Sequence, residues 1–96
     1  MSDMLAAAAA TLNEKVDGGF SAGTVKFNIE GEGAIMLDGA GARVADETAD
    51  VTMNADADTF REILDGELNP TAAFMGGKLT VDGDMGLAMQ LASVLA

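Results

Sequence analysis

The residues that could carry acid–base or metal chemistry in this chain are its carboxylates. Of the 96 residues, 16 are Asp or Glu, whereas His, Cys, Tyr and Trp are absent. Two pairs, Asp56-x-Asp58 and Asp82-x-Asp84, have the spacing of calcium ligands. Neither pair continues into the longer acidic loop with a terminal Glu that a calcium site requires. Helix capping explains both pairs more simply, so we expect no metal site and no cofactor.

Nucleophilic catalysis is not indicated either. The usual general bases and nucleophiles His, Cys and Tyr are missing. The serines, Ser2, Ser21 and Ser93, lie near a terminus, in an expected loop and on an expected helix, without an adjacent base. The loop glycines resemble a dinucleotide fingerprint only loosely, because no helix start follows them. The sequence therefore predicts a binding or structural domain rather than an enzyme.

The net charge excludes several partners. Sixteen acidic and five basic residues give a net charge of −11. Nucleic-acid phosphates must be met by clusters of Lys and Arg, so no nucleic-acid partner is expected. Docking by charge on anionic membranes is disfavoured for the same reason. Apolar residues make up 49% of the chain and include seven Met, whose flexible side chains adapt to irregular cavities.

The final segment carries the strongest functional signal. From Met85 to Ala96 only Gln90 and Ser93 are polar, and a helix that is apolar all round needs cover on every side. The segment is shorter than the ~20 residues that span a bilayer, so stable membrane insertion is not expected. A ligand, a partner chain or exposure must account for the surplus apolar surface. A structural or dimerisation module, or an accessory module whose last helix a partner covers, is the alternative to ligand binding; the oligomeric state stays open, with a weak homodimer as one option.

Two periodicities predict the first part of the fold. Apolar residues three to four apart predict a helix that is capped by Ser2 or Asp3 and reaches about Val16, ended by Gly18-Gly19. From Thr24 the period becomes two, which predicts strands over residues 25–30, 34–38, 42–45 and 49–55. The start of the chain lacks the basic region of a signal peptide. We expect one domain over residues 1–96 and a cytoplasmic location.

The second half of the chain alternates helices with one more strand. Asp56 or Asp58 is expected to cap a helix that ends at Gly66 and turns Phe60, Ile63 and Leu64 inward. Asn69-Pro70 predicts the start of a short helix. Leu79 and Val81 alternate with polar residues and predict a fifth strand, and Asp84 is expected to cap the final helix.

The stretch from Phe60 to Leu91 is similar to a known family, the sterol carrier protein type two family of nonspecific lipid-transfer, sterol-binding domains. The residues that carry the resemblance are Phe60, Leu64, Gly66, Leu68-Asn69-Pro70, Ala73-Phe74-Met75, Gly77-Lys78-Leu79 and Val81-x-Gly83-Asp84-Met85-Gly86-Leu87-Ala88-Met89-x-Leu91. A string of this length with matched spacing is far more specific than a short motif. Before Phe60 the order of elements agrees, without diagnostic residues.

The resemblance implies an α+β fold, with a five-stranded, mostly antiparallel sheet and helices packed on one face that enclose an apolar tunnel. It also implies noncovalent binding and intracellular carrying or buffering of a lipid, namely a fatty acid, a fatty acyl-CoA, a sterol or a phospholipid. Carried over by position, the lipid-binding wall residues are Phe74, Met75, Met85, Leu87, Ala88, Met89 and Leu91. Each of these positions fits an ordinary core residue equally well.

The chain departs from the animal members of that family in charge. Where they tend to carry Lys, this chain has Glu67, Thr80 and Gln90. The phosphates of acyl-CoA are best held by Arg or Lys. The departure therefore speaks against acyl-CoA as the ligand and leaves the apolar cavity untouched.

Overall fold

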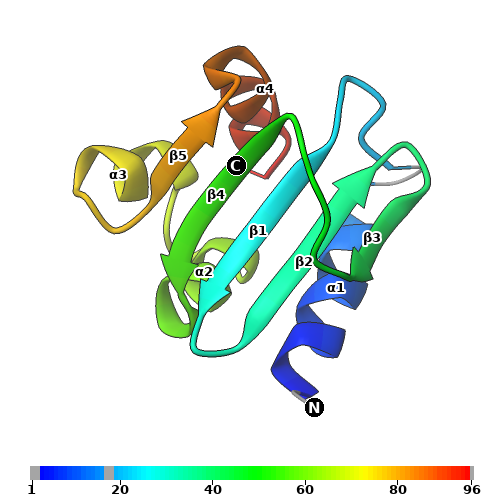
Figure 1. Cartoon of the computed structure of the whole chain (residues 1–96). Coiled ribbons are helices and arrows are strands. Elements are labelled where there is room, and N and C mark those ends of the chain that lie inside the picture. Colours follow the sequence, from blue (N-terminus) through cyan, green and yellow to red (C-terminus); the bar gives the residue numbers. More distant parts are fainter. Residues whose placement is uncertain (1–2, 17–18, 96) are drawn as a thin grey trace.

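The strands form one sheet in the order β3-β2-β1-β4-β5 (Figure 1). The computed structural model describes residues 3–16 and 19–95. Within them β1 pairs with β4 in parallel, and every other neighbouring pair is antiparallel. The strand bounds are β1 Val25–Glu30, β2 Gly33–Asp38, β3 Gly41–Val44, β4 Val51–Asp56 and β5 Thr80–Gly83. The predicted five-stranded, mostly antiparallel sheet is confirmed.

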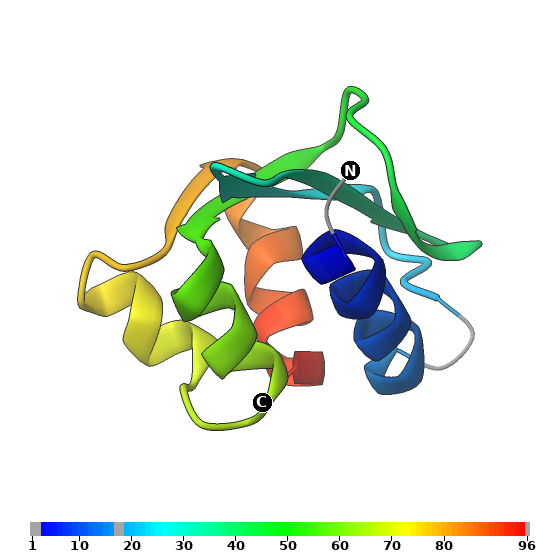
Figure 2. The same cartoon turned by 90° about the horizontal axis from the view of Figure 1, so that it is seen from below.

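The helices lie on one side of this sheet, as Figure 2 shows. Their bounds are α1 Asp3–Lys15, α2 Ala57–Leu64, α3 Pro70–Met75 and α4 Met85–Leu95. Figure 1 shows that α3 sits beside β5, at the edge of the sheet. The α+β fold class expected from the sequence is therefore confirmed. Two residues of the expected boundaries of the first helix, Ser2 and Gly18, lie outside the described residues.

The period of two in the strands produces the sheet's apolar face. Val25, Phe27 and Ile29 of β1 are buried. Their register partners on β2 and β4 are buried as well: Leu37, Ile35, Val51, Met53 and Ala55. The ring of Phe27 lies 5.1 Å from the ring of Phe60 on α2, measured between centroids. This face is the floor on which the helices pack.

The connection from β3 to β4 crosses the opposite face of the sheet. Figure 2 shows residues 45–50 on the side away from the helices. The amide of Ala45 donates to the Ala34 carbonyl at 3.3 Å, and Lys26 Nζ lies 2.9 Å from Asp46 Oδ1. Met36, whose register partner is Lys26, is buried although it lies outside the main core. We call residues 45–50 the crossing segment. The fourth strand was expected to begin at residue 49 but begins at Val51, because residues 49 and 50 belong to the crossing segment.

The helix boundaries follow the capping signals. Asp56 caps α2, because its Oδ1 accepts from the Thr59 amide at 2.7 Å. The hydrogen bond from the Thr59 amide, and next to it one with the Thr59 side chain, lower the pKa of the Asp56 carboxyl below its usual value. Gly66 follows α2 with φ of +81°. Asn69 caps α3 by accepting from the Thr71 amide at 2.8 Å.

Asp50 joins the starts of three elements. Its Oδ2 accepts from the Thr24 amide at 3.2 Å, and its own amide donates to the Thr24 hydroxyl at 3.0 Å. Its carbonyl accepts from the amide of Asp84 at 3.1 Å, and Asp84 Oδ1 in turn accepts from the Leu87 amide at 3.2 Å, which caps α4. The position of α4 is thereby tied to the starts of β1 and β4.

The close approach of β5 to Asp50 gives a first prediction. Gly83 has φ of +110°, and a Cβ there would lie 2.5 Å from the Asp50 carbonyl oxygen. Gly31 also has positive φ, but nothing lies within 4 Å of its Cβ position. We expect Gly31→Ala to cost only the backbone strain of ~1–2 kcal/mol. Gly83→Ala should cost clearly more, since the clash adds to the strain. Urea unfolding of both variants measures the difference, and equal losses would contradict the tight junction.

Candidate functional site

Helix α4 has a buried side and an exposed apolar side. Its buried residues are Leu87, Ala88, Leu91 and Leu95. On the other side the Met89 side chain is 55% exposed, and Met85 is exposed as well. An exposed face with large apolar side chains is the unusual feature of this helix, because its neighbours already cover the Leu-rich side.

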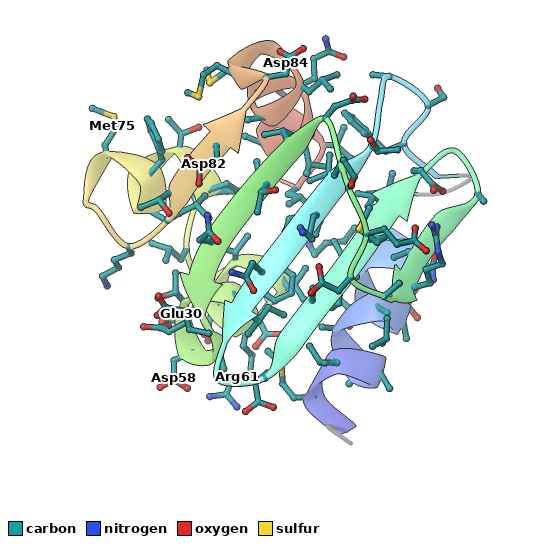
Figure 3. The ribbon with its side chains drawn as sticks, in the orientation of Figure 1. Glu30, Asp58, Arg61, Met75, Asp82 and Asp84 are labelled. Atoms are coloured by element: carbon teal, nitrogen blue, oxygen red, sulfur yellow. The ribbon has the colours of Figure 1, made fainter. Side chains whose placement is uncertain are left out.

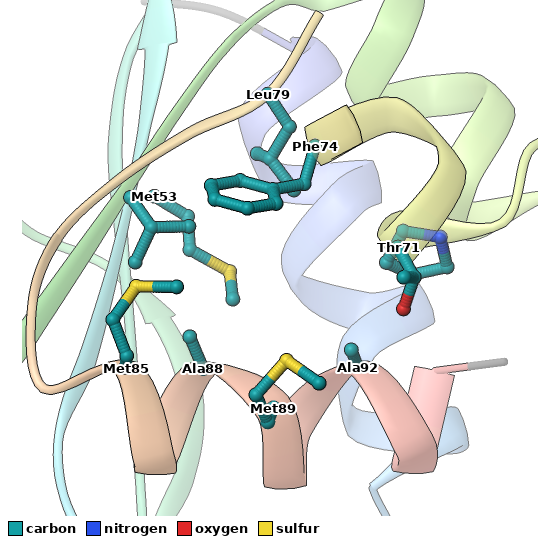
Figure 4. Close-up of a pocket in the computed structure, with 10 residues that line it drawn as sticks. Met53, Thr71, Phe74, Leu79, Met85, Ala88, Met89 and Ala92 are labelled. Atoms are coloured by element: carbon teal, nitrogen blue, oxygen red, sulfur yellow. The ribbon is translucent and has the colours of Figure 1, made fainter. Parts of the chain in front are cut away.

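The exposed Met residues of α4 face a groove that opens between α3, α4 and the β4–β5 edge (Figure 4). The cavity volume of this α3–α4 groove is about 30 Å³. The Phe74 ring reaches in from α3 toward Met53 and Met85, and Ala88, Met89 and Ala92 line the α4 side (Figure 4). The remaining lining residues are Pro70, Thr71, Leu79 and Val81.

The lining of the α3–α4 groove is chemically uniform. Thr71 supplies the single polar side chain among the described residues that line it, and no charged side chain is among them. A charge placed there would lose its hydration without gaining a partner. An apolar group would instead gain contacts with flexible Met side chains. The groove can therefore bind apolar matter and carries no group for acid–base chemistry.

Four of the seven residues predicted from the sequence meet at this groove: Phe74, Met85, Ala88 and Met89. The others lie elsewhere. The Met75 side chain is 82% exposed and points away from the molecule at the end of α3 (Figure 3). Leu87 and Leu91 belong to the main core.

Six lining residues were not among the predicted lipid-binding residues: Met53, Pro70, Thr71, Leu79, Val81 and Ala92. Part of the signal was present, because Met53, Leu79 and Val81 are the apolar members of alternating strands. Met53 and Val81 are register partners in the β4–β5 pair. Placing them beside α4 requires the strand order, which the alternation does not contain.

A second hollow lies between α1 and α2, with a volume of about 380 Å³. It is lined by Met4, Ala7, Ala8, Thr11, Arg61, Leu64 and Asp65. The small Ala side chains of α1 leave this space. Arg61 on its rim is exposed and pairs with Asp58 at 2.7 Å. This hollow is larger but more polar, and no residue predicted for the site lines it.

The described part of the chain contains neither a candidate metal site nor a candidate membrane span. No group of three or more Asp or Glu side chains is placed to hold a metal ion there. None of its helices combines the length and the apolar character needed to cross a membrane.

Comparison with known proteins decides the family. A family model described as the SCP-2 sterol transfer family matches residues 4–96. The chain belongs to this family. The match confirms the resemblance seen between Phe60 and Leu91 and extends it over the first helix and the first four strands.

Two relatives are much longer than this chain. Hydroxysteroid dehydrogenase-like protein 2 of Danio rerio is 44% identical over 82 residues, which are 77% of this chain and 20% of that protein. Sterol carrier protein 2 of Rattus norvegicus is 40% identical over 65 residues, or 67% of this chain and 11% of that protein. The chain thus spans a fifth or less of these two relatives.

A solved structure shows the same fold. The solution structure of Sterol Carrier Protein-2 from Aedes aegypti, in complex with palmitate, superposes with a TM-score of 0.77. The superposition covers 100% of this chain and 97% of the Aedes aegypti chain, at 21% sequence identity. At this identity the likeness concerns the fold.

The two sides of α4 give a second prediction. Leu91 is fully buried in the core, whereas Met89 is half exposed at the groove. Leu91→Ala should lower the free energy of unfolding by ~2–5 kcal/mol because it leaves a cavity. Met89→Ala should cost less than ~1 kcal/mol, as exposed positions do. Chemical denaturation of the two variants tests this, and a loss at Met89 as large as at Leu91 would show that Met89 is core.

Proposed function

We propose that this SCP-2 family domain binds one lipid chain noncovalently in the α3–α4 groove, and that it carries or buffers the lipid without catalysing a reaction. The observation that carries the proposal is the uncharged, Met-rich lining of the groove beside an exposed mouth. The family description and the palmitate complex of the Aedes aegypti neighbour support it. The cytoplasmic location expected from the sequence is part of this proposal.

The groove must widen to take up a chain. Its cavity volume of about 30 Å³ is far below the ~300–1,000 Å³ of typical ligand sites. The side chains that would move are Phe74, Met85 and Met89, which are all partly exposed. Met is unbranched and changes rotamer readily, so it can line both an empty and a filled groove.

Burial of methylene groups supplies enough binding energy. Each buried methylene contributes ~0.8 kcal/mol, so a palmitoyl-length chain offers about 12 kcal/mol before costs. Immobilisation takes back ~4–15 kcal/mol. With a cost at the lower end, micromolar binding needs no salt bridge. The head group would stay in water at the mouth, because the groove offers it no charged partner.

Chain length and a blocked groove test this proposal together. Fatty acids of increasing length should bind with rising affinity, since each added methylene is buried. Met89→Lys places a charge at the groove, where it hinders an apolar chain, and should abolish most of this binding. Because Met89 is half exposed, the Lys side chain can extend into water, and the melting temperature should change little.

The matched control is Val44→Lys. Val44 lies on β3 and is 52% exposed, close to the 55% of Met89, but it does not line the groove. This variant should bind chains as the unmodified protein does. Affinity that does not rise with chain length, or equal effects of the two Lys variants, would overturn the proposal. If Met89→Lys unfolds the domain, Met89 belongs to the packed core and not to the lining of the groove.

The charge of the chain yields a prediction for acyl-CoA. Acyl-CoA should bind no more tightly than the free fatty acid of the same length, because the net charge is −11 and no cation lines the groove among the described residues. Added salt should improve acyl-CoA binding by screening the repulsion. Calorimetric titration at low and high salt measures this. Tight binding that weakens with salt would reveal a basic site.

A second role is favoured by the length of the relatives. The Danio rerio relative is named hydroxysteroid dehydrogenase-like, and this chain matches only 20% of it. In a protein built that way, a domain that holds a lipid would be covalently linked to a second unit. We propose that such a domain can also present its lipid to a linked enzyme, which raises the local lipid concentration there.

A further inference from the structure

Four exposed apolar side chains of α3 and α4 lie at the α3–α4 groove or next to a residue that lines it. They are Phe74, Met75, Met85 and Met89, all exposed, and we call them the mouth patch. Phe74, Met85 and Met89 also line the groove. Met75 extends outward from the end of α3 (Figure 3). Met75 follows Phe74 at the end of α3, so the patch reaches from the groove lining to the outer end of that helix.

The mouth patch belongs to two helices that carry no charge in an acidic protein. Neither α3, with the sequence PTAAFM, nor α4, with MGLAMQLASVL, contains a charged residue. The 16 acidic and five basic residues of the chain all lie outside these two helices. Apolar side chains exposed on two helices without charges, within a protein of net charge −11, limit the partners that can cover them.

We propose that the mouth patch docks reversibly on the surface of an electrically neutral lipid bilayer. This inference rests on the proposed function, because docking there would place the open groove against the lipid source. A zwitterionic interface accepts apolar side chains without requiring basic residues on the protein. An anionic bilayer would repel the net negative charge. A lipid chain could then pass into the groove without crossing water.

A second copy of the chain fits the patch less well. Two copies would each bring a net charge of −11, and their mutual repulsion opposes association. The patch has four side chains, whereas a stable protein interface uses ~20–30 residues on each side. A planar bilayer requires neither a complementary surface nor so large a contact.

The chain offers a matched control for docking. Val44 is a large apolar residue with 52% exposure on β3. Figure 1 shows β3 at the edge of the sheet opposite to β5, far from the groove mouth. The variants Met75→Asp and Val44→Asp therefore add the same charge at exposed apolar positions. Only the first alters the mouth patch.

The experiment measures co-sedimentation with vesicles of pure phosphatidylcholine and with vesicles that also contain phosphatidylglycerol. The unmodified protein should bind the neutral vesicles more strongly. Met75→Asp should weaken that binding about tenfold or more, as expected for losing a buried Met side chain. Val44→Asp and Met75→Leu should bind as before. Because Met75 is highly exposed, all three variants should fold.

Stronger binding to the anionic vesicles, or equal losses for Met75→Asp and Val44→Asp, would overturn the docking proposal. So would a concentration-dependent dimer that Met75→Asp abolishes, since a second copy would then cover the patch. A soluble fatty-acid titration separates this proposal from the proposed function. Binding of fatty acid without binding to neutral vesicles overturns docking alone. Met75→Asp should transfer lipid between neutral vesicles more slowly while its affinity for soluble fatty acid is unchanged.

Discussion

The parallel pairing of β1 with β4 is the contact on which the other elements depend. Antiparallel neighbours can be joined by a tight turn, whereas a parallel pair requires a long connection. Here β2, β3 and the crossing segment supply that connection. The pairing places β4 next to the central strand β1. The helix that follows β4, α2, then packs under Phe27, and β5 can pair with the other edge of β4. The groove forms because the pairing of β4 with β1 fixes the position of β5, α3 and α4, which follow in the chain.

Local signals in the sequence predicted the elements well, because their causes are local. Gly66 takes the positive φ that ends a helix, and Asn69 and Asp84 accept the amide hydrogen bonds of the helices they cap. The strand order could not be read in the same way. Parallel pairing of Val25 with Val51 joins residues far apart in the sequence, and no local pattern encodes it.

The sequence predicted an apolar site beside the last helix, but it did not predict which residues line the groove. A helix that is apolar all round does not reveal which stripe meets the core, and the structure assigns Leu87 and Leu91 to it while Met85 and Met89 face the groove. The position of α3 decides the opposite wall. It depends on the turn after Met75, where the amides of Lys78 and Leu79 both donate to the Ala73 carbonyl. The functional role of these wall residues stays a prediction.

The crossing segment also has a consequence for how the molecule assembles and opens. Its contacts, such as Lys26 with Asp46 and Ala45 with Ala34, join it to a sheet that must already contain β1 and β2. Because the crossing segment leads directly into β4, it can cover Met36 only after β4 has paired with β1. Residues 46–48 and 50 of the segment are exposed, and Met36 is the large buried side chain on the face that it crosses, among the described residues. Elements with so few apolar contacts open more often than the core, so the amide protons of the crossing segment itself, such as that of Ala45, should exchange with solvent long before those of β1 and β4.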